Sequence, residues 1–226
     1  MNQFTQRHYQ ALLAYLKKSL RTGELHDGSR LPPEEELAAI LSFSVPSLRE
    51  AMHLLEMFGL LTQDTSGGYR LSHDVTRGFT DIFSLMLLLN QLKYSDVHRL
   101  RRSIELQSVP AILENITERE RQMLYLCLAR MMASAHGDRR ADTEFHDLLL
   151  TASGDQLVIS LNRALAQFMG TNRNLLDDTF YFENWDELVQ IHVKLYRAIC
   201  AKDMHTAIEA VNEHYDFLLY LDEPTR

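Results

Sequence analysis

Near the start of the chain, apolar residues recur at helical spacing in three successive runs. The run from 6 to 20 has one apolar face, formed by Tyr9, Leu12, Leu13, Leu16 and Leu20. A second run begins at Pro32 and ends at Leu41, and its early acids suit the positive end of a helix dipole. The third begins at Pro46 and ends at Gly59, where a left-handed residue would stop it. The pattern predicts three helices, with a tight turn between the second and the third.

Two short strand-like stretches follow the third predicted helix. They cover residues 60–66 and 69–71, and Gly67 and Gly68 lie between them as in a β-hairpin turn. Three helices, a tight turn and a hairpin in this order predict a winged helix-turn-helix domain over residues 1–75. A small α/β subdomain without a role in nucleic-acid binding is the alternative.

After Gly78 the chain consists of apolar runs of helical period separated by short polar breaks. We therefore predict a mainly α protein whose second domain, residues 79–226, is an all-α bundle of about six or seven helices. The first helix of that domain, 79–92, is expected to join the two domains. It is the most apolar run of the chain, but it is shorter than the roughly 20 residues that a membrane-spanning helix needs.

Composition and charge narrow the classes of function. Hydrophobic residues make up 46% of the 226 residues and charged residues 24%, as in a soluble protein with a core. The net charge of −8 argues against a protein that coats nucleic acid or an anionic membrane, although it allows a local DNA-reading patch. Two cysteines, Cys127 and Cys200, are too few for a disulfide framework and suit a reducing compartment. We expect a soluble, cytoplasmic protein with no membrane partner.

Four side chains in the second domain have the spacing of metal ligands. Asp142 and His146 are four residues apart, so a helix places them on one face. His192 and His214 each lie 11 residues from Asp203, which stands in the break between two helical runs. In an antiparallel helix pair, both would lie about 16 Å from the turn and could face each other. Three nitrogens and one oxygen suit zinc or nickel, with manganese or iron as alternatives, and leave coordination positions open.

Other interpretations of these residues are open at this point. The four possible metal ligands could instead be separate polar residues on solvated faces or hydrogen-bonded core histidines. His98, which is not among them, is interpreted as a surface residue. His146 and Asp147 also match the adjacent pair of HD-type metal-dependent phosphohydrolases, although neighbouring helical residues diverge by about 100°. A pure dimerisation module with methionines filling the bundle is a further alternative.

Parts of the sequence resemble a known family. Residues 23–38, GELHDGSRLPPEEELA, together with Ser47–Ala51 and Gly59–Leu61, resemble the DNA-binding domain of GntR-type bacterial transcription regulators. The resemblance to the FadR subfamily extends through the second domain. It implies a homodimer that binds a double-stranded DNA operator and has an all-helical effector domain, and so a regulator rather than an enzyme.

The DNA contacts of this family carry over only in part. Its members usually have arginines where this chain has Glu35 and Val45, whereas Arg49 matches the third family arginine. Residues 1–75 hold seven Lys and Arg and nine Asp and Glu, a net charge of −2. We therefore expect weaker DNA binding or a different operator, since phosphate contacts supply much of the affinity. The predicted DNA-binding residues are Arg30, Ser44, Ser47, Arg49, Gly67 and Gly68.

The resemblance also bears on the metal ligands. Many FadR-type bundles carry an Asp-x-x-x-His, a His and a final His at this sort of spacing, and bind there a metal that holds a small carboxylate effector. Arg101 matches the family arginine ahead of an Ile-Glu pair and is predicted to pair with that carboxylate. We expect a regulator whose operator affinity depends on an effector at the metal site Asp142, His146, His192 and His214. A metal-responsive regulator without an organic effector is the alternative.

Overall fold

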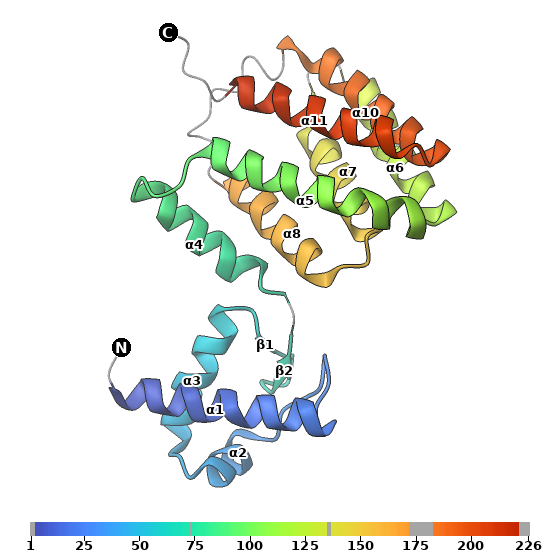
Figure 1. The fold of residues 1–226 in the computed structure, drawn as a ribbon. Coiled ribbons are helices and arrows are strands. Elements are labelled where there is room, and N and C mark those ends of the chain that lie inside the picture. Colours follow the sequence, from blue (N-terminus) through green and yellow to red (C-terminus); the bar gives the residue numbers. More distant parts are fainter. Residues whose placement is uncertain (1–2, 73, 135–136, 172–182, 222–226) are drawn as a thin grey trace. The chain divides into compact units, whose positions relative to one another are not determined.

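The computed structural model describes residues 3–72, 74–134, 137–171 and 183–221 (Figure 1). The chain divides into two compact units, Met1–Phe79 and Thr80–Arg226. The first elements are α1 (Gln3–Thr22), α2 (Glu34–Leu41), α3 (Val45–Met57), β1 (Leu61–Gln63) and β2 (Tyr69–Leu71). They are followed by α4 (Thr76–Leu88), α5 (Tyr94–Asn115), α6 (Glu118–Ala133), α7 (Arg139–Thr151), α8 (Gln156–Thr171), α10 (Trp185–Ala201) and α11 (Met204–Leu221). The prediction of a mainly α fold is confirmed.

The first unit is built on a helix-turn-helix. α1, α2 and α3 share a core that includes Leu12, Leu37, Leu48 and Leu55. α2 ends at Ser42, whose φ of 57° is left-handed, and Ser44 then caps α3 by accepting a hydrogen bond from the Ser47 N–H. The chain thus reverses within three residues, because a left-handed C-cap is followed at once by an N-cap.

A two-stranded hairpin follows α3. β1 and β2 are antiparallel, with Leu61 opposite Leu71 and Gln63 opposite Tyr69. The segment before α2 adds to this hairpin, because the Leu71 N–H donates to the Ser29 carbonyl and the Leu31 N–H to the Tyr69 carbonyl, at 2.9 and 2.8 Å. The predicted helix-turn-helix with its wing is therefore present.

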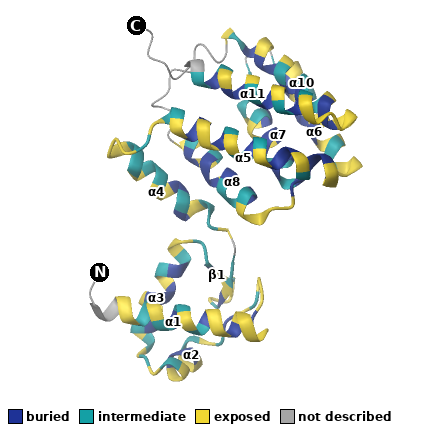
Figure 2. Ribbon diagram, viewed as in Figure 1, coloured by how far each residue is buried: buried dark blue, intermediate teal, exposed yellow. Residues whose placement is uncertain are grey.

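The second unit is a helical bundle with one large apolar core (Figure 2). α10 and α11 form an antiparallel hairpin, and α5 packs along α11 (Figure 1). The hairpin turns at Lys202, whose φ is 55°, and Asp203 caps α11 by accepting from the Thr206 N–H at 3.1 Å. α7 packs against α6, α8 and α5. In the part of the chain that the structure describes, no helix has both the length and the apolar character needed to cross a membrane.

Candidate metal centre

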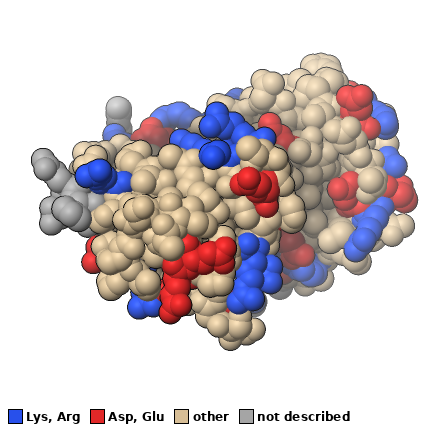
Figure 3. All heavy atoms as spheres, turned by 90° about the horizontal axis from the view of Figure 1, so that it is seen from below, with Lys and Arg blue, Asp and Glu red and all other residues tan. Residues whose placement is uncertain are grey.

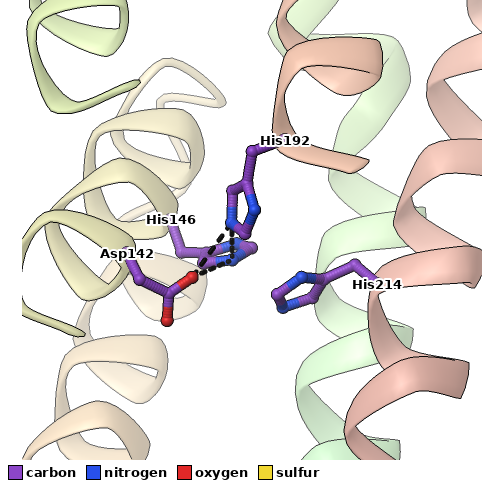
Figure 4. Close-up of side chains that lie close together, drawn as sticks. All are labelled: Asp142, His146, His192 and His214. Atoms are coloured by element: carbon purple, nitrogen blue, oxygen red, sulfur yellow. Dashed lines mark hydrogen bonds and ion pairs between the residues drawn. The ribbon is translucent and has the colours of Figure 1, made fainter. Parts of the chain in front are cut away.

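Three helices bring the four predicted metal ligands together in the core of the bundle (Figure 4). α7 presents Asp142 and His146 from successive turns, while His192 comes from α10 and His214 from α11. Each of the three histidines is only 1% exposed. One possible ligand atom from each of the four side chains lies within 4.8 Å of the others.

The shortest separations in this cluster join possible ligand atoms directly. Asp142 Oδ1 lies 3.0 Å from His192 Nε2 and 3.6 Å from His146 Nε2. The two Nε2 atoms are 3.1 Å apart. His214 approaches from the opposite side, with its ring centroid 4.4 Å from that of His146 and 4.9 Å from that of His192 (Figure 4).

The second nitrogen of two imidazoles is held outside the cluster. His192 Nδ1 lies 2.8 Å from the Leu188 carbonyl, to which its N–H donates. His146 Nδ1 lies 2.9 Å from Glu105 Oε1 on α5, and the Tyr215 hydroxyl donates to the same carboxylate oxygen at 2.5 Å. An N–H fixed at Nδ1 leaves the Nε2 lone pair free for a metal, and such outer partners are typical of metal-binding histidines.

The arrangement fits a divalent cation. Asp142 Oδ1 and the Nε2 atoms of His146 and His192 face each other with separations of about 3 Å. Their lone pairs repel unless a proton or a cation lies between them. Among the described residues, His214 Nδ1 has no hydrogen-bond partner, although it is buried. Ligand atoms about 2.1 Å from an ion are themselves about 3.0–3.4 Å apart, which the two shortest separations match. The donor set of three imidazoles and one carboxylate suits zinc or nickel.

The electrostatics of the cluster keep a proton on His146 when no ion is present. Burial lowers the pKa of His146, but the carboxylates of Glu105 and Asp142 outweigh it and raise that pKa to about 9. Burial raises the pKa of Asp142, and the hydrogen bonds from His146 and His192 bring it well below its usual value. Burial, together with the charge of His146, holds the pKa of His214 well below its usual value, so this ring is neutral.

Arg101 lies beside this cluster. It is 7% exposed, its Nη2 is 4.0 Å from Glu105 Oε1, and its guanidinium carbon is 6.0 Å from the centre of the Tyr215 ring. Arg101 is therefore buried beside the cluster and does not lie on the surface of the bundle.

Two interpretations from the sequence need correction. His98 is 7% exposed rather than on the surface, because α5 begins at Tyr94 and turns His98 inward together with Arg101 and Glu105. Burial, and next the charge of Arg101, lowers the pKa of His98 to about 3. Asp147 lies outside the cluster, in a pair of hydrogen bonds from Arg163, so it does not act with His146 as an HD-type pair would.

Glu105 and Tyr215 are the residues of the site that the sequence interpretation did not single out. Glu105 is 0% exposed, and an acid at a core position of a helix signals a buried partner. Tyr215 follows His214 directly and is also 0% exposed. Both side chains act on the imidazole of His146 from the side opposite the cluster.

The predicted DNA-binding residues lie at two places in the first unit. Ser44 and Ser47 cap the N-terminus of α3, and Arg49 on the same helix is paired with Glu34 of α2 at 2.5 Å. At the hairpin, Arg30 donates to Ser66 at 2.7 Å, and its guanidinium also lies where a Cβ at Gly68 would fall. Gly67 has a φ of +80° at the tip of the turn.

Acidic and basic side chains are mixed around this region. Glu35 is exposed and Val45 packs against the core of the first unit, so neither can supply the guanidinium of the family pattern. On the face drawn in Figure 3, Lys and Arg side chains stand beside Asp and Glu side chains, and neither sign covers the face.

Comparisons with known proteins identify the family. The model of the bacterial regulatory proteins of the gntR family matches residues 8–71, and the FCD domain model matches residues 96–217. The chain belongs to the gntR family of transcription regulators, in its FCD branch. The predicted resemblance to FadR-type regulators is confirmed, and the matched families are regulators rather than enzymes.

Individual relatives agree with this assignment. The chain is 30% identical over 202 residues to the uncharacterized HTH-type transcriptional regulator YcbG of Bacillus subtilis, covering 88% of this chain and 83% of the relative. It is 25% identical to the HTH-type transcriptional repressor NanR of Edwardsiella tarda, covering 88% and 79%. Among solved structures, Streptococcus agalactiae GntR has the same fold, with a TM-score of 0.68, 23% identity and coverage of 96% and 99%.

Proposed function

We propose that this regulator is a cytoplasmic homodimer whose affinity for its DNA operator is set by a small carboxylate bound at a zinc or nickel site. Asp142, His146, His192 and His214 hold the metal ion. Arg101 pairs with the carboxylate of the effector, because its guanidinium matches a carboxylate in geometry and charge.

The observation that carries this proposal is the arrangement of lone pairs in the cluster. Four buried side chains bring their possible ligand atoms within 4.8 Å, and the outer nitrogens of His146 and His192 are tied to Glu105 and to the Leu188 carbonyl. A structural histidine needs only one hydrogen-bond partner for each polar atom. Three imidazoles converging on one carboxylate, with the outer nitrogens of two of them held by other groups, are instead typical of a metal site.

The effector is proposed to act through linkage between two sites. A divalent ion with four protein ligands has room for carboxylate oxygens of a small molecule. Asp142 and His146 hold α7 to α10 and α11 through the cluster, while Arg101 connects α5 to the bound acid. An effector that binds one arrangement of these helices more tightly than the other shifts the protein toward that arrangement. The change in operator affinity is then at most the ratio of the effector's affinities for the two arrangements.

A binding experiment with the full-length protein tests the proposal. DNA fragments selected from a random pool supply an operator, and its affinity is measured with metal-loaded protein across a panel of small organic acids. We expect at least one acid to change the affinity by about 5-fold to 150-fold. No change with any acid, in protein shown to carry the metal, would contradict the effector role, and a response to the metal by itself would support the metal-responsive alternative.

A further inference from the structure

A buried amide on α8 has no partner for its polar atoms. Asn162 is 1% exposed, and neither its Oδ1 nor its Nδ2 has a hydrogen-bond partner among the described residues. Such a group is unfavourable in a protein interior, because it has lost its hydrogen bonds to water without replacing them. A buried polar group in this state indicates a place that a ligand or an ordered water completes.

α8 runs antiparallel to α5, and two contacts establish this direction. Near the start of α5, the Tyr94 ring stacks on the Phe168 ring of α8, with centroids 5.8 Å apart. At the end of α5, the Asn115 side chain donates at 3.4 Å to the carbonyl of Ser153, three residues before α8 begins. Figure 1 shows the two helices side by side. A position one turn later on α5 therefore faces a position one turn earlier on α8.

This register places Asn162 opposite Arg101. Val97 of α5 and Leu165 of α8 pack in one apolar cluster. Arg101 follows Val97 by four residues and shares its face of α5, while Asn162 precedes Leu165 by three residues and shares its face of α8. The buried amide is thus turned toward the arginine that is proposed to pair with the carboxylate of the effector.

α7 provides a second, independent reference for the position of Asn162. Arg163 donates to Asp147 of α7 from Nε at 2.9 Å and from Nη2 at 3.2 Å. Asn162 directly precedes Arg163, and His146 directly precedes Asp147. Asn162 and His146 are each 1% exposed, so they lie beneath this surface ion pair at the same level of the bundle. Since α5, α7 and α8 all pack against one another, Asn162 borders the interior region of the candidate metal ligands.

From this placement we infer that Asn162 binds the effector, and that the effector carries a hydroxyl group in addition to its carboxylate. The amide has a donor, Nδ2, and an acceptor, Oδ1, and both need a partner. A carboxylate oxygen only accepts and an ammonium group only donates, so either would leave one atom of the amide unsatisfied. A hydroxyl group does both. This inference rests on the proposed function, which supplies the metal ion and the carboxylate at Arg101.

Three small acids separate this inference from the proposed function. Propionate, lactate and 3-hydroxypropionate share a carboxylate and a chain length, and they differ only in whether and where they carry a hydroxyl group. The experiment is calorimetric titration of the zinc-loaded, full-length protein with each acid, with zinc content measured before and after. We expect at least one hydroxy acid to bind with a Kd about tenfold lower than that of propionate, because a site built for a hydroxyl rejects the analogue that lacks it.

Variants on α8 assign this preference to the amide. Asn162→Leu keeps the branched shape of the side chain and removes its polar atoms. We expect the Kd for the preferred hydroxy acid to rise about tenfold, to near that of propionate. Without any acid, the Tm of the second unit should rise by about 2–4 °C, because the unsatisfied amide is gone. Gln167→Leu replaces an exposed amide of the same helix and is the matched control, in which both the preference and the Tm should stay as they are.

Each outcome is decisive. If no hydroxy acid is preferred by the unmodified protein, water alone satisfies the amide and the inference is overturned. A preference that persists in Asn162→Leu overturns it as well, because another group, such as the metal, then binds the hydroxyl. A lower Tm in Asn162→Leu would show that the amide is a supporting part of the fold and would also overturn it. If the leucine variant does not fold, Asn162→Ala gives the same comparison of affinities without a larger side chain. A protein that takes up no zinc, or that carries zinc and binds none of the three acids, overturns the proposed function, and the inference falls with it.

Discussion

At the scale of single residues, the candidate metal site depends on groups that do not touch the ion. Glu105 accepts from His146 Nδ1 at 2.9 Å and is itself held by the Tyr215 hydroxyl. The Leu188 carbonyl has the same role for His192. These partners fix the tautomer and the orientation of two imidazoles, so that each Nε2 faces Asp142 before any ion binds.

Removal of the outer partner of His146 should weaken metal binding. In Glu105→Ala we expect the affinity for zinc to fall about 10-fold to 100-fold, because the His146 ring loses the acceptor that orients it. Competition with a chromophoric chelator measures this affinity. Glu114→Ala removes an exposed acid from the same helix and serves as the control, which should match the unmodified protein. Equal affinities in the two variants would contradict the role of Glu105.

Metal binding should also tighten as the pH rises. Without an ion, His146 has a pKa of about 9 and is protonated at pH 7, so a metal must displace this proton. The pKa of Asp142 is well below its usual value, so this carboxylate is already ionised at pH 7. One displaced proton makes the affinity rise about tenfold per pH unit from pH 7 to near 9 and level off above that. Chelator competition at several pH values measures the slope, and a pH-independent affinity below pH 9 would contradict this electrostatic account.

Some of the site could be predicted from residue spacing, and some could not. The equal distances of His192 and His214 from Asp203 predict that they face each other, and their ring centroids lie 4.9 Å apart. Glu105 and His98 were missed because their burial depends on which side of α5 meets α7 and α11. That choice is made by packing between distant segments, and the mixed polar pattern of α5 does not reveal it.

At the scale of the elements, the hairpin and the helix-turn-helix rely on glycine at one close approach. Gly59 has a φ of +73° after α3, and an added Cβ would lie 1.8 Å from the Asp74 carbonyl oxygen. Gly23 has a similar φ of +77° but nothing within 4 Å of an added Cβ. The two positions therefore share backbone strain and differ in steric contact.

This pair of glycines gives a matched stability test. Gly23→Ala should destabilise the first unit by about 1 kcal/mol through its left-handed backbone, and Gly59→Ala should cost several times as much because the Asp74 backbone must also move. Denaturant unfolding, followed by a probe in the first unit, measures both values. If the two variants lose similar amounts of unfolding free energy, the contact at Asp74 has no energetic role.

α3 carries the one arginine that matches the family pattern of DNA contacts. Arg49 is exposed and held by Glu34 in the absence of DNA. We expect Arg49→Gln to weaken operator binding by about 1–3 kcal/mol, since a guanidinium contact with a base or a phosphate is lost. Electrophoretic mobility shifts measure the change, with Arg99→Gln, an exposed arginine of the second unit, as the control. An unchanged affinity in Arg49→Gln would exclude this arginine from the DNA interface.

The elements themselves could be predicted from the periodicity of apolar residues. The predicted first helix, 6–20, lies within α1, and the predicted hairpin contains β1 and β2. The prediction of where the joining helix ends is less accurate. The end was predicted at 92, but α4 ends at Leu88, since Asn90 adopts a left-handed φ of 55° that breaks the helix. A long apolar run does not by itself show where the backbone turns.

At the scale of the whole molecule, the chain joins a DNA-reading unit of the gntR type to an FCD bundle. The helical periodicity of apolar residues and the distribution of glycine predict both units and their order along the chain. The composition of the interior site depends instead on which side chains the packing of α5, α7, α10 and α11 turns inward. Arg101, whose Nη2 is 4.0 Å from Glu105 Oε1, comes near the ligands of α7 only in the folded bundle.

Four side chains from three helices are proposed to bind one metal ion. Elemental analysis of full-length protein, purified without chelators from medium supplied with zinc and nickel, tests it most directly. We predict about one ion per chain in the unmodified protein, none in the double variant His192→Ala/His214→Ala, and about one in His205→Ala, whose side chain is 85% exposed. A protein without a stoichiometric ion, or a double variant that keeps it, would contradict the account.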